Sequence, residues 1–151
     1  TKTASHQAAT EVTVADNAIL CVQPTASSNG TQITITHLFD RIPVRKKFLK
    51  KDETELNHCM QLIQAIALAY PTIDFKVTAD NKTIMQVTNT GTLQKRALEL
   101  CDFIHDHTLI MLPTNTENKS LTITGFITNH QLYRYDRNNI FIFVNHRWVK
   151  D

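Results

Sequence analysis

Hydrophobic and polar residues alternate in several short stretches of the chain, and each stretch predicts a strand with one buried face. These stretches cover residues 10–14, 31–36, 75–78 and 121–126. Strands are also predicted over residues 19–22, 83–87 and 108–112, where apolar residues predominate. A continuously apolar run at 140–144 predicts a buried strand near the centre of a sheet. The pairs Asp16–Asn17 and Asp80–Asn81 are typical of tight turns, so the strands flanking each pair are expected to form a hairpin. A polar loop is expected at 114–119.

A different periodicity, that of an amphipathic helix, runs from about residue 53 to 70. Asp52 is expected to cap this helix together with Glu55, and Pro71 ends it. A shorter helix is predicted over 93–103. The longer helix carries an apolar stripe at helical spacing, formed by Leu56, Cys59, Met60, Ile63, Ile66, Ala67 and Tyr70. Because helices and strands do not strictly alternate, the pattern predicts an α+β fold with a mixed β-sheet backed by helices.

The composition is that of an ordinary globular chain of 151 residues with a net charge of +2. No apolar run reaches membrane-spanning length, and no signal peptide opens the chain. The three cysteines are far apart and predict a reduced, cytoplasmic set of thiols. Thr1 in place of an initiator Met, together with the abrupt end at Asp151, suggests an excised fragment.

Positive charge is concentrated in one short segment, which holds six of the 16 lysines and arginines: Arg41, Arg45, Lys46, Lys47, Lys50 and Lys51. Such a cluster can neutralise phosphates without reading a base sequence. It can equally be a solvated basic loop that Phe48 and Leu49 anchor to the core. Composition alone favours the second interpretation, since a single run of charge is weak evidence for binding.

Other candidate chemistry is sparse. His105 and His107 flank an aspartate, but no further Cys or His spacing completes a zinc site, so an exposed turn is predicted there and no metal. No catalytic or nucleotide-binding motif is present. Cys59 lies on the apolar stripe and is expected to be buried and unreactive. Near the end of the chain, Arg147 and Lys150 follow the apolar strand and could present charge to a partner, or simply lie in a strand-to-helix connection.

Several of these segments, taken together, resemble one family. Residues 38–50 resemble the Leu-Phe-x-Asn-x-Pro-Ala-Arg-x-Lys-Phe-Leu signature of the MutL DNA mismatch repair family, and residues 30–31 match the Gly-Thr before it. Residues 55–58 and 65–69 are similar to the family's next helix, and residues 143–147 to its Val-Asn-Gly-Arg element. The matches cover nearly the whole chain in the right order. Three residues depart from the pattern, at Arg41, Val44 and His146; the last replaces a glycine whose backbone conformation is one that few other residues tolerate.

The resemblance implies the transducer part of the MutL N-terminal region, with a fold like domain 2 of a small-subunit ribosomal protein and a left-handed βαβ crossover. Residues 1–8 are then an arm or a remnant of the preceding ATPase domain, and residues 9–151 a transducer truncated at its C-terminus. The nucleotide-binding motifs of that ATPase are absent, so no catalysis is expected from this chain alone. It is expected to hold no cofactor itself; ATP and Mg belong to the full-length protein.

The implied partners are DNA, bound through its phosphate backbone, MutS, the ATPase domain and a second MutL subunit, in the cytoplasm and with no membrane. The matching basic positions are Arg45, Lys47 and Arg147; weaker candidates for DNA binding are Lys46, Lys50, Lys51 and Lys150. The structural residues of the motifs are Gly30, Thr31, Phe39, Pro43, Phe48 and Asn145. Two alternatives stay open: a relay or interaction module that binds no DNA, and the transducer of a gyrase-B-type ATPase.

Overall fold

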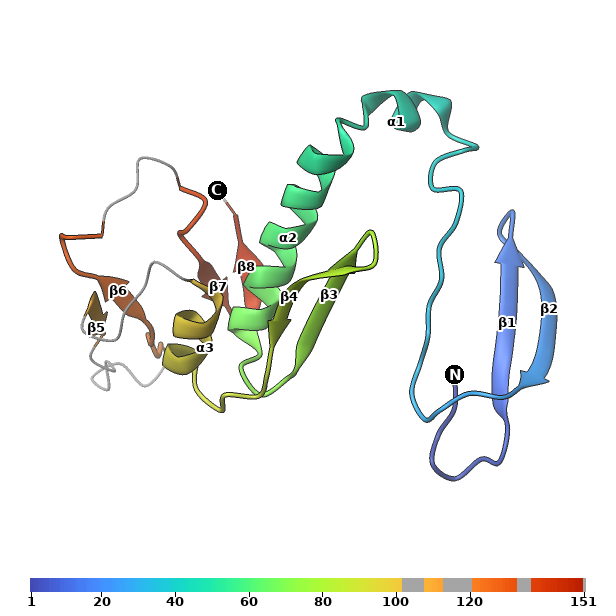
Figure 1. Cartoon of the computed structure of the whole chain (residues 1–151), viewed down its shortest axis with the longest axis horizontal. Helices are drawn as coiled ribbons and strands as arrows, with labels where there is room; N and C mark the ends of the chain where they lie inside the picture. Colours follow the sequence, from blue (N-terminus) through green and yellow to red (C-terminus); the bar gives the residue numbers. More distant parts are fainter. Residues whose placement is uncertain (102–107, 113–120, 133–136, 151) are drawn as a thin grey trace. The chain divides into compact units, whose positions relative to one another are not determined.

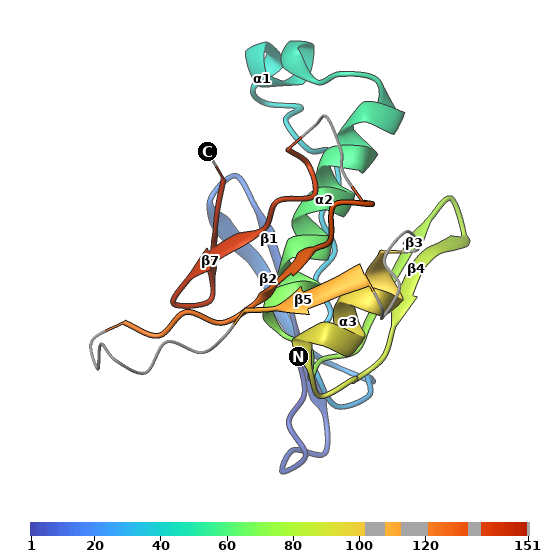
Figure 2. The same ribbon diagram turned by 90° about the vertical axis from the view of Figure 1, so that its left-hand side faces the viewer.

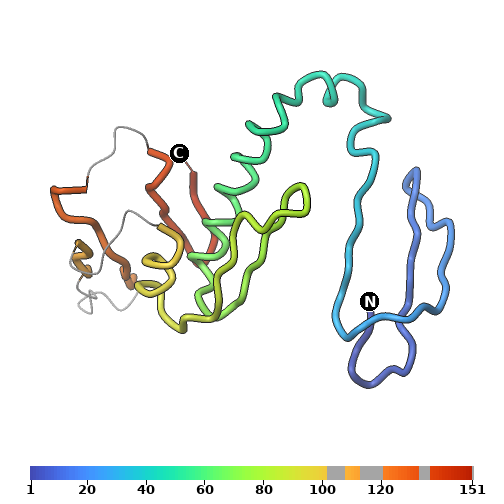
Figure 3. Tube along the Cα trace, in the orientation of Figure 1, coloured from blue at the N-terminus to red at the C-terminus, as the bar shows by residue number. Residues whose placement is uncertain are grey.

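The computed structural model describes residues 1–101, 108–112, 121–132 and 137–150 (Figure 1). The chain divides into two compact units, Thr1–Leu49 and Lys50–Asp151. The first unit holds β1 (Ala9–Ala15), β2 (Ala18–Thr25) and α1 (Pro43–Phe48). The second holds α2 (Asp52–Ala69), β3 (Phe75–Ala79), β4 (Lys82–Val87), α3 (Leu93–Leu100), β5 (Leu109–Met111), β6 (Phe126–Thr128), β7 (Ile142–Val144) and β8 (Arg147–Val149), as the tube in Figure 3 traces. The predicted boundary between residues 8 and 9 stays a prediction.

Three of the antiparallel pairs are tight hairpins of the same kind. Each is closed by two residues with positive φ: Asp16–Asn17 at 58° and 60°, Asp80–Asn81 at 49° and 62°, and Asn145–His146 at 49° and 63°. This conformation defines a type I′ turn, whose twist matches that of the flanking strands. Asn and Asp tolerate it because their short polar side chains bond locally. The first two hairpins were predicted and are confirmed; the third was missed.

In the first unit, the β1–β2 hairpin is confirmed, but the third predicted strand is wrong. Residues 31–36 pair with no strand among the residues that the structure describes. Ile33 and Ile35 are 80% and 75% exposed, so neither face of this segment is buried. Alternation supplies the side chains for a half-buried strand, but a strand also needs a neighbour to take its backbone hydrogen bonds. Residues 24 and 25, predicted as loop, extend β2.

The long helix α2 is confirmed, with a different start. Its N-cap is Lys51, and Asp52 is the first helical residue, so the predicted cap by Asp52 is wrong. The carboxylate of Glu55 accepts a hydrogen bond from the backbone N–H of Lys50 at 2.9 Å. Glu55 therefore satisfies an amide just before the helix, one position earlier than in a regular capping box. Together with Asp52 and Glu53 it places negative charge at the positive end of the helix dipole.

The buried face of α2 is rotated relative to the predicted stripe. Its buried residues are Ala65, Ala67 and Leu68, whereas Cys59 is exposed. The prediction of a buried Cys59 is therefore wrong. α3 packs against α2, as Figures 1 and 2 show, and small buried side chains such as Ala65 and Ala67 allow a neighbouring element to approach the helix closely. Among the described residues of the second unit, the buried apolar core consists of the buried side chains of α2 with Val87 of β4 and Ala97 of α3.

The α+β class is confirmed, and every sheet in the described part of the chain is a two-stranded antiparallel pair. β6 begins at the last residue of the predicted strand 121–126, and residues 121–125 form no strand. β7 is not a central strand within the described ranges, since it pairs with β8 alone and Ile142 is 58% exposed. Leu100 ends α3, and the predicted extension to residue 103, the loop 114–119 and the pair His105/His107 lie outside the described residues.

Candidate nucleic-acid interface

The basic cluster of the first unit is built on a short helix. Ile42 is the N-cap of α1 and Pro43 its first residue, a position that suits the fixed φ of proline and its missing N–H. Arg45, Lys46 and Lys47 fill the last turn of α1 and are all exposed. Phe48 is 78% exposed, so the predicted anchoring of a basic loop by Phe48 is wrong. The basic side chains are therefore presented by a helix whose apolar residues also face solvent.

Two of the cluster's cations are already paired within their own unit. The Arg41 guanidinium forms an ion pair with Asp16, in the turn between β1 and β2. The Lys46 ammonium donates to an Asp40 carboxylate oxygen. Lys47 makes no ion pair with any residue that the structure describes. Exposed pairs are worth at most about 1 kcal/mol, but they reduce the net field that a phosphate meets.

The Asp40–Lys46 pair has a measurable consequence. The hydrogen bond from Lys46 lowers the pKa of the Asp40 carboxyl below its ordinary value. A lowered folded-state pKa means that the pair stabilises the fold fully above the unfolded-state pKa, and that this contribution is lost as the pH falls through the folded-state pKa. We expect Lys46→Met to raise the titration midpoint of Asp40 in a carboxyl NMR titration. Lys47→Met is the matched control, and an equal shift in both variants would contradict the pairing.

The residues of the family signature that carry no charge shape the backbone around the cluster. Phe39 has a φ of 64°, in the left-handed region that bulky residues rarely occupy, and the Arg45 guanidinium carbon lies 6.0 Å from the centre of its ring. Gly30 has a φ of 124° and pairs with Lys2 in an isolated antiparallel bridge. The Thr31 hydroxyl lies 2.9 Å from that of Thr1. The Gly-Thr pair thus ties the start of the chain to the segment that leads into the signature.

The second unit holds the remaining basic candidates. Lys51 is the N-cap of α2 and Lys50 precedes it. Arg147 opens β8 and is exposed, with no ion pair among the described residues. Lys150 follows β8; its ammonium donates to the Gln61 side-chain oxygen at 2.8 Å and lies 5.5 Å from the centre of the Trp148 ring. The structure thus places Arg147 at the start of β8 and Lys150 directly after its end, while Arg45, Lys46 and Lys47 belong to the other unit.

Sequence reasoning missed Arg96, the one fully buried large side chain within the described part. It is 0% exposed and donates to the backbone oxygens of Pro71 at 3.0 Å and Ile73 at 2.7 Å. Its guanidinium also lies 5.8 Å from the centre of the Phe75 ring. One signal could have found it: Arg96 falls three residues after Leu93 and four before Leu100, on the apolar stripe of α3.

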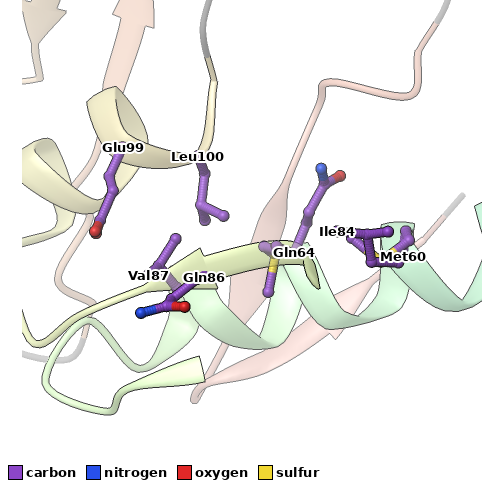
Figure 4. A pocket seen from close by; sticks show the side chains of 8 residues that line it. Met60, Gln64, Ile84, Gln86, Val87, Glu99 and Leu100 are labelled. Atoms are coloured by element: carbon purple, nitrogen blue, oxygen red, sulfur yellow. The ribbon is translucent and has the colours of Figure 1, made fainter. Parts of the chain in front are cut away.

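A hollow of about 320 Å³ lies between α2, β4 and α3 (Figure 4). Its polar lining includes Gln64, Gln86 and Glu99, and no lysine or arginine contributes to it. The Glu99 carboxylate accepts a hydrogen bond from the Thr88 N–H at 3.0 Å, so this charge is occupied within the fold. The hollow therefore lacks the chemistry of a phosphate site and is not part of the basic surface.

Comparisons with known proteins agree with the family resemblance of the sequence motifs. A family model described as DNA mismatch repair protein, C-terminal domain, matches residues 104–151. The DNA mismatch repair protein MutL of Leuconostoc citreum (strain KM20) is 35% identical over 128 residues, which cover 85% of this chain and 19% of the relative. MutL of Streptococcus pneumoniae (strain CGSP14) is 30% identical over 132 residues, covering 86% of this chain and 20% of the relative. The chain belongs to the MutL family of DNA mismatch repair proteins. The family prediction is thereby confirmed.

The fold agrees with a solved MutL structure. The Aquifex aeolicus MutL ATPase domain complexed with ADP matches with a TM-score of 0.76 and 23% identity, over 96% of this chain and 54% of that one. This likeness supports the overall fold of a MutL N-terminal region. The chain spans about a fifth of the length of the curated MutL relatives that it matches.

Membership of the MutL family also explains the turn before Arg147. The Val-Asn-Gly-Arg element of the family has its glycine where this chain has His146, whose φ is 63°. A glycine adopts this conformation without strain, and histidine is among the residues that tolerate it better than most. The turn is therefore a type I′ hairpin turn here despite the substitution.

Among the residues described, no group of His, Cys, Asp and Glu side chains could hold a metal ion, and no helix is long and apolar enough to cross a membrane.

Proposed function

We propose that this chain is the transducer part of a MutL protein. In this role it couples ATP binding by the neighbouring ATPase domain to dimerisation, DNA binding and MutS-dependent repair in the cytoplasm. ATP and Mg would be held by that ATPase domain, and the chain alone would carry out no catalysis. The proposed domain spans residues 9–151, with residues 1–8 an arm or a remnant of the ATPase domain. A ribosomal-protein-domain-2-like mixed sheet with a left-handed crossover remains part of this proposal.

The proposed DNA contacts are electrostatic. The observation that carries them is the exposure of basic side chains at the positions of the two MutL motifs: Arg45 and Lys47 on α1, and Arg147 at the start of β8. An exposed cation with no acidic partner is available to neutralise a phosphate and release its counterions. Lys50 and Lys51 are further candidates on the same grounds. Lys46 and Lys150 are weaker ones, because Asp40 and Gln61 already engage their ammonium groups.

A second candidate function is a relay that binds no DNA. The pairing of Arg41 with Asp16 and of Lys46 with Asp40 favours it, because these cations serve contacts within the first unit. The two candidates differ in one measurable property, the response of DNA binding to salt. The gyrase-B-type alternative is disfavoured, since the two relatives described above are MutL proteins.

The test is fluorescence anisotropy of a labelled DNA duplex titrated with this chain across a salt series. If three to four phosphates are contacted, the logarithm of the binding constant falls against the logarithm of salt concentration with a slope near −3, since each contact contributes about −0.9. Two duplexes of unrelated sequence should give the same affinity, because phosphate contacts carry no sequence information. Absence of binding at low salt would rule out DNA binding by this chain and favour the relay.

A further inference from the structure

We infer that Tyr70 and Gln61, two residues of the α2 region, position Arg147 for DNA binding by holding β8 at two points. The inference rests on the proposed function, because it concerns how the Arg147 side chain meets a phosphate. Figure 1 shows β8 beside α2, and the two elements pack against each other. Neither Tyr70 nor Gln61 is basic, so neither is among the proposed phosphate contacts.

The first point of attachment is a ring stack. Tyr70 is the C-cap of α2, and its ring lies 6.1 Å from that of His146, with an angle of 24° between the planes. His146 is the second residue of the β7–β8 turn and directly precedes Arg147. A stacked pair of aromatic rings is favourable beyond the burial of its area. The stack therefore restrains the turn at the residue before the proposed phosphate contact.

The second point of attachment lies at the other end of β8. The Gln61 side-chain oxygen accepts a hydrogen bond from the Lys150 ammonium at 2.8 Å. The Gln61 side-chain nitrogen donates to the backbone oxygen of Asn138 at 3.3 Å. Gln61 thus joins the segment before β7 to the residue after β8, and both ends of the hairpin segment are fixed to one helix residue.

The spacing of the two points fits a strand lying antiparallel to the helix. From Gln61 to Tyr70 is nine positions, about 13.5 Å at 1.5 Å per helical residue. From His146 to Lys150 is four positions, about 13 Å at 3.3 Å per strand residue. Side chains alternate along β8, where Trp148 is half-buried and Arg147 and Val149 are exposed. Arg147 is therefore held on the solvent side of a strand that is fixed at both ends.

This attachment matters because, in the part of the chain that the structure describes, β7 and β8 pair only with each other. β7 and β8 form a two-stranded sheet, and an isolated two-stranded hairpin is at best marginally stable in water. Without the stack on Tyr70, Arg147 would sample more orientations, and binding a phosphate would carry the added entropic cost of ordering the side chain. The expected cost to DNA affinity is smaller than that of removing Arg147 itself.

The experiment is a double-mutant cycle in DNA binding, measured with this chain by anisotropy at low salt. Arg147→Ala removes one phosphate contact and is expected to weaken binding by up to about tenfold near 0.1 M salt. Tyr70→Leu is expected to weaken it by about threefold, a fraction of that effect, because Arg147 must then be ordered on binding. In the Arg147→Ala background, Tyr70→Leu should have no further effect. Tyr70→Phe keeps the ring and should bind as the unmodified chain does.

Gln61→Ala should behave like Tyr70→Leu, and Gln64→Ala is the matched control, because Gln64 lies on the same helix and lines the hollow of Figure 4 instead. The single tryptophan, Trp148, gives a readout independent of DNA: its emission should shift to longer wavelength in Tyr70→Leu and Gln61→Ala, and not in Gln64→Ala. If Arg147→Ala binds DNA normally, the proposed role of Arg147 fails. A second outcome is that Arg147→Ala weakens DNA binding, but Tyr70→Leu lowers DNA affinity equally with and without Arg147, or does not lower it at all. That outcome overturns only the positioning role of Tyr70 and Gln61.

Discussion

Reversing the charge at Arg45, Lys47 and Arg147 together is expected to abolish measurable DNA binding. Each phosphate contact that is lost flattens the slope of log binding constant against log salt concentration by about 0.9. Losing three contacts therefore lowers DNA affinity on the order of 10²–10³-fold near 0.1 M salt. Glutamate at these positions also adds repulsion from the phosphates. The measurement is the dissociation constant for a labelled duplex, with circular dichroism to establish that the variant is folded. All three side chains are exposed, so the substitutions should leave the fold intact.

The matched control reverses the same number of charges elsewhere. Lys76, Lys82 and Lys95 are exposed lysines on β3, β4 and α3, outside both MutL motifs. Changing these three to glutamate alters the net charge by the same amount. If only overall charge mattered, both triple variants would lose binding equally. We expect the control to lose much less, and equal losses would contradict the assignment of the phosphate contacts to Arg45, Lys47 and Arg147.

Arg96→Ala is expected to destabilise the chain by about 3 kcal/mol, because truncating a buried side chain leaves a cavity and unpaired polar groups. The Arg96 guanidinium is fully buried and holds the backbone oxygens of Pro71 and Ile73, in the connection from α2 to β3. Its removal takes the Arg96 donor from both oxygens; the Pro71 oxygen still accepts a hydrogen bond from the Thr90 backbone N–H at 3.1 Å, so the loss falls mainly on the Ile73 oxygen. Two nitrogens of the Arg96 side chain, Nε and one terminal nitrogen, have no hydrogen-bond partner, so burying this arginine costs free energy. Removing that cost makes the loss of stability in Arg96→Ala smaller than it would otherwise be.

Urea unfolding followed by circular dichroism measures this effect. Lys95→Ala is the control, since Lys95 precedes Arg96 on α3 and is exposed; it should change stability by less than about 0.5 kcal/mol. Arg96→Met keeps the apolar stem of the side chain and should fall between the other two variants. A loss of less than about 1 kcal/mol in Arg96→Ala would show that the Ile73 oxygen finds another partner, and that the guanidinium does not hold the α2–β3 connection.

Local signals in the sequence predicted the local structure well. The helical periodicity gave α2 to within one residue at each end, because an apolar stripe closed by Pro71 leaves little freedom. Asp16–Asn17 and Asp80–Asn81 identified their hairpins because these residues favour positive φ. The third hairpin was not predicted because histidine at position 146 is a weak turn signal. The resemblance to MutL pointed to a glycine at that position, and with it to a special backbone conformation.

Features that depend on distant partners were not predictable from the pattern. Residues 31–36 alternate like a strand, yet their pairing depends on a neighbour that no local pattern specifies. The buried face of α2 was misplaced because Ala65 and Ala67 carry little hydrophobic weight, although close packing in a protein interior favours such small side chains. Arg96 was missed because a charged residue is ordinarily assigned to the surface. The basic candidates could be read from the motifs, but their internal pairing with Asp16, Asp40 and Gln61 could not.

The most direct test of the central claim, that basic residues of the two MutL motifs contact DNA phosphates, is a comparison of salt slopes. The slope of the logarithm of the binding constant against that of salt concentration would be measured for the unmodified chain and for three single variants, Arg45→Ala, Lys47→Ala and Arg147→Ala. We predict that each variant flattens the slope by about 0.9, and that affinity falls equally on duplexes of different sequence. Slopes that stay equal to that of the unmodified chain would contradict the claim, and the chain would then be assigned to the relay function.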